Sequence, residues 1–306
     1  MAIFEKVNRT KEKRLAISKI ICYNKKKGEK CVLRLIVEEN QKLKEFTENH
    51  YAQGAFFWHY LLKNKEIKVN GKRVNADMPL SKGDEVCYFL TKKQEEKPAF
   101  FTVYEDENVL IVDKESGVNS EAVYAALKRE RECYFIHRLD RNTQGLLVFA
   151  LNAWTETALL QAFKEKKVEK RYHALCVGNF PKKSDVLTAY LKKDAEKSQV
   201  RVFDTPRAGA EKIITEYAVL SNSDGFSLAE VTLHTGKTHQ IRAHLAHIGC
   251  PIVGDMKYGD TAVNKAQKTA RQCLVSKRLR LHLDGALSYL SEKEFISRFE
   301  ANNLDL

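Results

Sequence analysis

Residues 137–150 read His-Arg-Leu-Asp-Arg-Asn-Thr-Gln-Gly-Leu-Leu-Val-Phe-Ala, a basic cluster followed by an apolar run. The cluster carries a single carboxylate, Asp140, and Gly145 leads into the apolar residues. An uninterrupted run of this kind predicts a strand buried on both faces of a sheet. We therefore expect Asp140 to be held at the mouth of rigid structure.

This segment alone leaves two interpretations of Asp140 open. An aspartate that stands beside Arg138 and Arg141 often caps a turn or pairs with one of the arginines, and such contacts are structural. The same carboxylate can instead be a catalytic group at the edge of a pocket. The remainder of the chain has to distinguish the two hypotheses.

Around this segment the apolar pattern predicts more strands than helices. The predicted strands are 109–112, 146–151, 172–177, 213–220 and 226–233. The predicted helices are 121–131, 153–167 and 238–248, the last ended by Gly249 and Pro251. The pattern indicates an α+β domain built around a mixed, largely antiparallel sheet.

The first third of the chain is predicted to form a smaller α+β domain. Residues 67–74 alternate apolar and polar side chains around Asn70-Gly71, which predicts a tight hairpin with positive φ at both turn positions. Residues 56–65 predict a helix ahead of it, and Lys82-Gly83-Asp84 predicts a turn behind it. The apolar runs 17–23 and 31–37 flank Lys25-Lys26-Lys27-Gly28 and leave a second hairpin or a loop open.

A charged segment separates these two regions. Residues 91–98 lack apolar periodicity, are dense in charge and end on Pro98, so we interpret them as a linker. The chain of 306 residues is long enough for two domains. The expected division is 1–90, linker 91–98 and 99–306.

Composition narrows the class of protein. With 43% hydrophobic and 30% charged residues, the chain is typical of a soluble globular protein. The net charge of +12 favours a polyanionic partner, with nucleic acid ahead of a membrane surface, although a well-solvated basic protein without such a partner has the same charge. Seven cysteines without a C-x-x-C pair indicate reduced core residues. No signal peptide or membrane-spanning run is evident, so a cytoplasmic location is expected.

Several ordered motifs resemble those of RluA-type pseudouridine synthases. The segment His137-Arg138-Leu139-Asp140 with Thr143 and Gly145 is similar to the catalytic motif of that family. Further similar segments are Tyr104–Gly117 with Lys114, the tyrosine motif Lys170–Ala174, the third motif Gly236–Ala246 with Gly254-Asp255 and Tyr258-Gly259, and the leucine motif Leu279–His282. Three positions depart from the family pattern, Glu115, Gln144 and Lys237, and we expect them to bear on substrate choice.

The resemblance implies an RNA pseudouridine synthase, an isomerase that acts on a uridine extruded from its stack. Asp140 would be the catalytic carboxylate, Arg242 would pair with it and favour its charged form, and Tyr172 would present an aromatic face and a hydroxyl to the uracil. The resemblance further implies substrate-binding positions at Arg138, Arg141, Thr143, Lys237, His239, Gln240 and Leu281.

The implied partner is RNA, with ribosomal RNA favoured over transfer RNA. Residues 67–86 resemble the second half of an S-four-like RNA-binding domain, so the N-terminal domain is expected to be a diverged version of it. The isomerisation needs no Lewis acid, and the histidines lack a metal-binding pattern, so neither a metal nor a cofactor is expected. We expect a monomer.

Two rival hypotheses remain at this point. One is a relative of the synthases that binds RNA without turnover, against which the joint presence of Asp140, Tyr172 and Arg242 argues. The other is a hydrolase of nucleosides or sugars, which usually needs two acidic groups around the scissile bond, whereas the motif offers one aspartate.

Overall fold

The chain divides into two compact units in the computed structural model, which describes residues 20–23, 30–194, 199–269 and 271–302, with 20–23 and 30–32 described by backbone alone. The first unit comprises Met1–Ala99 and Glu121–Cys133, and the second comprises Phe100–Ser120 and Tyr134–Leu306. The segment 121–133 thus groups with the first unit, although the sequence division assigned it to the second. Within the described residues no helix is long and apolar enough to cross a membrane.

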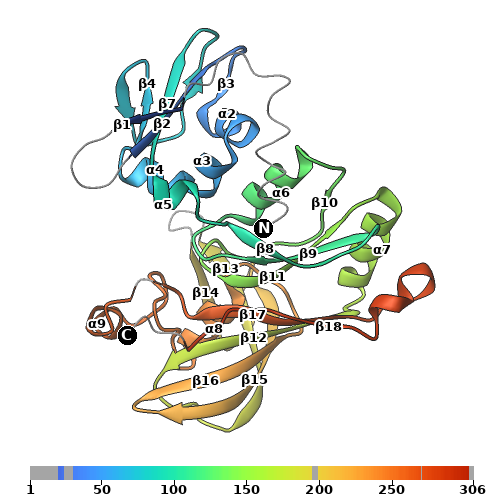
Figure 1. Ribbon diagram of the computed structural model, residues 1–306. Coiled ribbons are helices and arrows are strands. Elements are labelled where there is room, and N and C mark those ends of the chain that lie inside the picture. The colour runs from blue at the N-terminus through green and yellow to red at the C-terminus, as the bar shows by residue number, and fades with distance from the viewer. Residues whose placement is uncertain (1–19, 24–29, 195–198, 270, 303–306) are drawn as a thin grey trace. The chain divides into compact units, whose positions relative to one another are not determined.

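The first unit is α+β (Figure 1). Its sheet has the order β1-β2-β7-β4-β5, formed by Ile20–Tyr23, Lys30–Ile36, Glu85–Thr91, Ile67–Val69 and Lys72–Val74, and all neighbours are antiparallel. A short pair joins β3 (Gln41–Lys42) to β6 (Pro79–Leu80). Its helices are α2 (Leu43–His50), α3 (Ala52–Phe56), α4 (Trp58–Lys63) and α5 (Lys92–Glu95), to which Glu121–Cys133 adds most of α6 (Ser120–Lys128). A separate apolar core, with Phe46, Trp58 and Leu61 among its members, lies inside this unit.

The predicted hairpin at 67–74 is confirmed. Asn70 and Gly71 have φ of 49° and 78°, the positive values that a two-residue turn of this kind requires. The predicted helix at 56–65 is present as the shorter α4, preceded by α3. The sequence left a second hairpin or a loop open for residues 17–37. Strands β1 and β2 pair antiparallel, which favours the hairpin. The connecting residues Lys25-Lys26-Lys27-Gly28 lie outside the described part of the chain.

Residues 91–98, interpreted as a linker, contain a short helix. Thr91 and Gln94 form a capping box at the start of α5, because the Gln94 amide donates to the Thr91 hydroxyl (3.2 Å) and the Thr91 amide donates to the Gln94 side chain (2.9 Å). Gln53 donates to the Lys97 carbonyl (2.8 Å) and so ties the segment to the first unit. The helix has no buried residue, which explains why apolar periodicity gave no sign of it.

The second unit confirms the predicted α+β class with a large, mostly antiparallel sheet (Figure 1). Its main path runs β14-β13-β15-β16-β12-β17-β11-β9-β8, with β10 added beside β11 and β18 beside β17. In chain order the strands are β8 (Phe100–Glu105), β9 (Val109–Lys114), β10 (Tyr134–Phe135), β11 (Gln144–Ala150), β12 (Val168–Val177), β13 (Ser184–Asp194), β14 (Gln199–Phe203), β15 (Glu211–Ser223), β16 (Phe226–Leu233), β17 (Leu274–Leu281) and β18 (Glu294–Ile296). The remaining helices are α7 (Ala153–Lys164), α8 (Gln240–His247), α9 (Thr261–Ala266) and the 3-10 helix η2 (Gly285–Leu290).

All the strands and helices predicted for this region are present. Every residue of β11 is buried, as expected for the apolar run after Asp140, and β11 pairs with β9 on one side and with β17 on the other. Helix α7 packs on β10 and β11, and α8 packs on β14 and β15. Five of the cysteines are buried free thiols, as the sequence predicted. They are Cys87 and Cys133 in the first unit and Cys176, Cys250 and Cys273 in the second.

Gly145 allows β11 to lie against β17. The pair is parallel, unlike the other neighbours of the main path, and Gly145 stands beside Ser276 with φ of 110°. A Cβ atom at this position would lie 2.3 Å from the Ser276 carbonyl oxygen and 2.6 Å from its nitrogen. The glycine therefore brings the strand that follows Asp140 into contact with β17.

We expect Gly145→Ala to lower the free energy of unfolding by about 3 kcal/mol or more, because the methyl group meets backbone and the φ is unfavourable for alanine. Urea denaturation measures this loss. The matched control is Gly236→Ala, whose Cβ would meet no atom within 4 Å, and its unfolding should change by less than about 0.5 kcal/mol. Equal stability of both variants would contradict the close-approach argument.

Candidate active site

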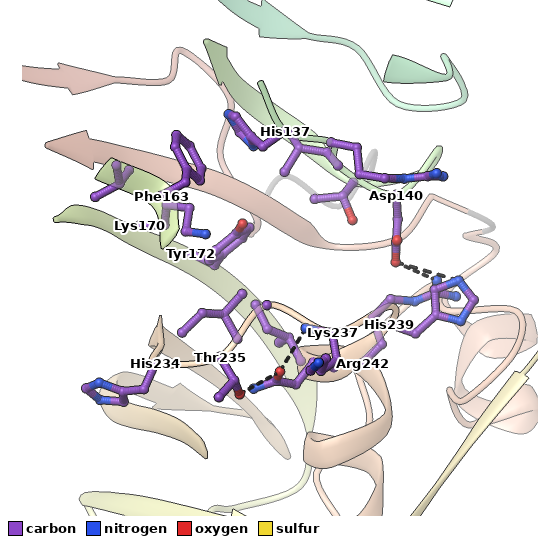
Figure 2. A pocket seen from close by; sticks show the side chains of 18 of the residues that line it. His137, Asp140, Phe163, Lys170, Tyr172, His234, Thr235, Lys237, His239 and Arg242 are labelled. Carbon is purple, nitrogen blue, oxygen red and sulfur yellow. Dashed lines mark hydrogen bonds and ion pairs between the residues drawn. The ribbon is translucent and has the colours of Figure 1, made fainter. Parts of the chain in front are cut away.

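A cavity of about 510 Å³ lies within the second unit, beside the loop that carries Asp140 (Figure 2). Its walls come from the loop 137–143, the end of α7, strand β12, the segment 233–237 and the start of α8. Asp140 is the one acidic residue among the residues that line it. The basic side chains on its wall are Arg138, Lys164, Lys166, Lys170, Lys237 and Arg242.

The loop that carries Asp140 is fastened to the segment after β9. The buried ammonium of Lys114 donates to the Arg141 carbonyl (3.1 Å). The Ser120 hydroxyl accepts a hydrogen bond from the Leu139 amide (3.0 Å) and donates one to the Leu139 carbonyl (3.0 Å). The backbone is thereby fixed on both sides of Asp140.

Arg242 joins two carboxylates. Its Nη1 donates to Asp140 Oδ2 at 2.9 Å, while Nε and Nη2 donate to the two oxygens of Asp255 at 2.6 and 3.0 Å. The Asp255 side chain has no exposed surface and that of Arg242 is 7% exposed, whereas the Asp140 side chain is 22% exposed. The buried pair thus holds the guanidinium in one orientation, and Asp140 is the carboxylate that reaches the cavity.

The charges of this cluster support one another. Burial alone would raise the pKa of Asp255, but Arg242 and the backbone amides of Lys257 and Tyr258 lower it below its ordinary value. Burial would lower the pKa of Arg242, yet its hydrogen bonds and charge contacts with Asp255 and Asp140 raise it. The guanidinium and Asp255 therefore both stay charged at neutral pH.

His239 lies on the other side of Asp140. Its Nε2 is 3.8 Å from Asp140 Oδ2, and its Nδ1 is 2.9 Å from the Tyr258 hydroxyl, which accepts a hydrogen bond from the Val200 amide (2.8 Å). Burial lowers the pKa of His239, and the charge of Asp140 opposes this only in part. The neutral imidazole thus lies between the Tyr258 hydroxyl, beside Nδ1, and the Asp140 carboxylate, nearest Nε2.

Tyr172 lines the cavity from strand β12 and is 6% exposed. Burial raises the pKa of its phenol, the charge of Asp140 raises it further, and a hydrogen bond with Ser276 opposes the shift. The phenol is therefore neutral at physiological pH. The cavity brings together Asp140, Tyr172 and Arg242, which lie on three separate segments of the chain (Figure 2).

Gln240 and its neighbours form a closed network at the start of α8. The side-chain oxygen of Gln240 accepts from the Thr235 hydroxyl (2.9 Å) and from the Lys237 amide (3.1 Å). Its nitrogen donates to the Ile214 carbonyl (3.1 Å) and the Thr215 hydroxyl (3.0 Å). Both hydrogens and both lone pairs of the amide are occupied within the protein, so Gln240 shapes the wall of the cavity.

The other predicted substrate-binding residues differ in their placement. Arg138 is exposed at the rim, and the ammonium of Lys237 pairs with Glu211. Thr143 is buried at the cavity wall, where its hydroxyl accepts from the Gln272 side chain (2.9 Å).

Arg141 and Leu281 do not line this cavity. The half-buried Arg141 donates through Nε to the Asn142 side chain (3.3 Å), and burial, together with the charge of Arg242, lowers its pKa. Leu281 has no exposed surface and packs in the apolar core of the second unit.

The structure also adds residues to which the sequence gave no role. Asp255 and Tyr258 stood within the third motif, so their pattern was visible, but only the folded chain brings them to Arg242 and His239. His137, Phe163 and Lys170 form one wall of the cavity. For Phe163 the sequence predicted a helix and nothing more.

His244 makes the stability of this unit dependent on pH. It is 2% exposed, its Nδ1 is 2.9 Å from the Thr215 hydroxyl, and burial, with a smaller contribution from His247, lowers its pKa to about 4. An unfolded histidine takes up a proton near pH 6.5, where folded His244 does not. Its stabilising contribution is thus complete above about pH 6.5 and is lost as the pH falls towards 4, by about 3 kcal/mol in all.

We therefore expect His244→Gln to reduce the loss of stability between about pH 6.5 and pH 4, while the remaining loss comes from His137, whose pKa burial lowers to about 3. Urea unfolding at several pH values measures how the free energy of unfolding depends on pH in the variant and in wild type. His282→Gln, at a side chain that is 53% exposed, is the control and should leave the profile unchanged. An equally steep profile in His244→Gln would show that another group is responsible.

Comparisons with known proteins agree with this geometry. Residues 95–247 match the family described as RNA pseudouridylate synthase. Ribosomal large subunit pseudouridine synthase C of Rickettsia felis is 31% identical over 232 residues, covering 66% of this chain and 76% of that protein. Ribosomal large subunit pseudouridine synthase D of Borreliella burgdorferi is 29% identical over 284 residues, covering 81% and 85%.

Solved structures show the same fold. Human RNA pseudouridylate synthase domain containing 1 has a TM-score of 0.54 and 26% identity, covering 60% of this chain and 79% of that one. Human RNA pseudouridylate synthase domain containing 4 has a TM-score of 0.53 and 22% identity, covering 65% and 88%.

The fold of the second unit is that of the pseudouridine synthases, a class of isomerases. The chain belongs to the RNA pseudouridine synthase family and is of the RluA type, as its motifs predicted. Of the hypotheses that the sequence left open, the isomerase is therefore confirmed, and the hydrolase and the RNA-binding relative without turnover are set aside. The comparison does not extend to an S-four-like origin of the first unit, which stays a prediction.

Proposed function

We propose that this enzyme converts specific uridines of ribosomal RNA to pseudouridine and that Asp140 is its essential catalytic group. The relatives named above are ribosomal large subunit pseudouridine synthases, which supports large-subunit ribosomal RNA over transfer RNA as the substrate. The observation that carries the proposal is the carboxylate of Asp140, held at 2.9 Å by a buried Arg242 on the wall of a cavity that also contains Tyr172.

The reaction exchanges one bond for another within the same nucleotide. The bond between ribose C1′ and uracil N1 breaks, the uracil turns, and a bond forms between C1′ and C5. The C5 proton leaves and N1 gains a proton, so no atom is added to the RNA overall and no oxidation occurs. Asp140 either adds to the sugar or the base or removes a sugar proton, and the proposal holds for each route.

A duplex would keep the target uridine out of reach, so we expect it to be extruded into the cavity. The volume of about 510 Å³ lies within the usual range for small-molecule sites. In this arrangement Tyr172 offers its ring to the base, Arg138 lies at the rim where we expect it to enter the gap left in the RNA, and the basic wall favours phosphate groups.

The N-terminal domain is proposed to add RNA contacts, with the enzyme acting as a monomer in the cytoplasm. The net charge of +12 supports a phosphate-dominated interaction. Binding of ribosomal RNA should therefore weaken steeply as salt is raised, and a salt-insensitive interaction would contradict this part of the proposal.

The decisive experiment is tritium release from an unmodified large-subunit ribosomal RNA transcript labelled at uridine C5, with a labelled transfer RNA pool run in parallel. Wild type should release tritium from the ribosomal transcript and leave a carbon-linked nucleoside in the digested RNA. Release from transfer RNA alone would overturn the substrate assignment. An abasic product would overturn the isomerisation.

A further inference from the structure

Lys170 is a cation inside the cavity, and no counterion for it appears in the described part of the chain. It lies on β12, two residues before Tyr172, and both line the cavity. Its ammonium lies 5.1 Å from the centre of the Phe163 ring. Burial lowers the pKa of Lys170, and no acidic group near enough to offset this is found among the described residues. Figure 2 shows the ammonium directed into the cavity on the side of Tyr172.

His137, beside Lys170 in the cavity wall, cannot neutralise it. The His137 ring stacks on Phe163, with centres 4.8 Å apart, and its Nε2 accepts a hydrogen bond from the Val148 amide (3.2 Å). Burial and the charge of Lys170 lower the pKa of His137 to about 3, so the ring is neutral with its proton on Nδ1. This end of the cavity therefore offers hydrogen-bond donors and positive charge.

Asp140 is the one carboxylate on the wall, and Arg242 already pairs with it. Lys170 is half-buried, and shielding an ammonium without a counterion from part of its water costs free energy that aromatic rings recover only in part. Such a group suits a site where negative charge appears during a reaction, because a fixed cation in dry surroundings stabilises that charge strongly. The exposed Lys164 and Lys166 at the rim suit the permanent charge of phosphates better.

The reaction proposed above creates such a charge on the uracil. When the C1′–N1 bond breaks, its electron pair stays with the base, and the resulting anion spreads over N1 and the carbonyl oxygens. If Asp140 instead adds to the base, the electron pair of the attacked double bond moves towards a carbonyl oxygen. The charge disappears when C5 bonds to C1′, and the base stays neutral overall because N1 gains a proton as C5 loses its own. Either route thus passes through a uracil whose oxygens are negative.

We infer that Lys170 is a further catalytic residue, whose ammonium contacts a carbonyl oxygen of the extruded uracil and stabilises the negative charge that develops there. The inference rests on the proposed function. Lys170 takes no proton from the base in this role. It acts as a fixed positive charge beside Tyr172, while Arg242 fixes Asp140.

The test compares Lys170→Gln with wild type in single-turnover pseudouridine formation on the large-subunit ribosomal RNA transcript. We expect the rate at saturating RNA to fall by about 10²- to 10³-fold, with RNA affinity within about threefold and the salt dependence of binding unchanged. Lys170→Arg should recover part of the rate. The matched control is Lys183→Gln, which removes one exposed charge from the loop between β12 and β13 and should turn over like wild type.

Two further readouts separate catalysis from a structural role. Lys170→Gln should melt no lower than wild type, because it removes a half-buried charge without a counterion among the described residues. The wild-type rate should fall as Lys170 loses its proton, at a pH below the ordinary lysine value, and this alkaline limb should be missing in the variant.

The possible outcomes remain distinct. In Lys170→Gln, the slope of log RNA affinity against log salt concentration could be shallower by about 0.7 while the rate at saturating RNA is unchanged. That result would assign Lys170 to a phosphate contact and overturn the inference. A wild-type rate in Lys170→Gln, or a large drop in its melting temperature, would also overturn it. If wild type itself formed no pseudouridine, the proposed function would fail, which is a different result from an active wild type with an equally active variant.

Discussion

Replacing Asp140 with asparagine is expected to abolish pseudouridine formation, with a rate loss of about 10⁴-fold or more, while RNA affinity stays within about threefold of wild type. The amide cannot act as a nucleophile or as a base, so each route open to the carboxylate is closed. It keeps the shape of the side chain and can still accept a hydrogen bond from Arg242.

The fold should tolerate this change. Arg242 keeps its two hydrogen bonds to the buried Asp255, so the guanidinium retains a counterion when Asp140 loses its charge. Asp140 is also the more exposed of the two carboxylates. Tritium release measures the rate, and binding to the same transcript measures affinity. A collapse of affinity or of the melting temperature would show that Asp140 is structural, as an aspartate between two arginines can be.

Asp255→Asn is expected to have the second largest effect, lowering the free energy of unfolding by about 3 to 5 kcal/mol. The side chain of Asp255 is fully buried and binds Arg242 through both oxygens, so the variant leaves a buried guanidinium with one counterion, the partly exposed Asp140. The neutral amide also has one oxygen in place of two, and it weakens the contacts with the amides of Lys257 and Tyr258.

The same variant should lower the rate by about 10²-fold, because Arg242 no longer has one fixed orientation against Asp140. Urea unfolding and tritium release measure the two effects separately. Asp224→Asn, in an exposed turn with φ of 51°, is the matched control and should leave both unchanged. A stable and fully active Asp255→Asn would show that Arg242 needs no second carboxylate to hold Asp140.

Together these variants divide the site into two layers of contacts. Asp140 faces the cavity and Asp255 lies behind Arg242, so the first change should affect turnover alone and the second both turnover and folding. Lys170 is expected to show a third pattern, a loss of rate without a loss of stability, because its charge has no counterion to leave behind among the described residues.

The sequence by itself identified the segment that carries Asp140, the protein family and one hairpin of the first unit. The apolar run after Gly145 is buried on both faces whatever its neighbours are, so its pattern identified β11 and the place of Asp140 at its edge. The spacing of the motifs identified the family, and Asn70-Gly71 identified a hairpin, because these signals depend on residues that are close together in the chain.

Only the tertiary structure decided how the distant motifs meet. Asp140, Arg242 and Asp255 form one cluster because β11 and β17 pair in parallel beside Gly145 and α8 packs on β15, and no local pattern specifies such contacts. Leu281 was expected in the cavity and lies in the core, and Gln240 was expected to bind substrate and has its amide occupied within the protein. Lys170 is the clearest example, because a lysine in a sequence is expected to be solvated, and only the packing beside Phe163 and His137 makes its charge half-buried.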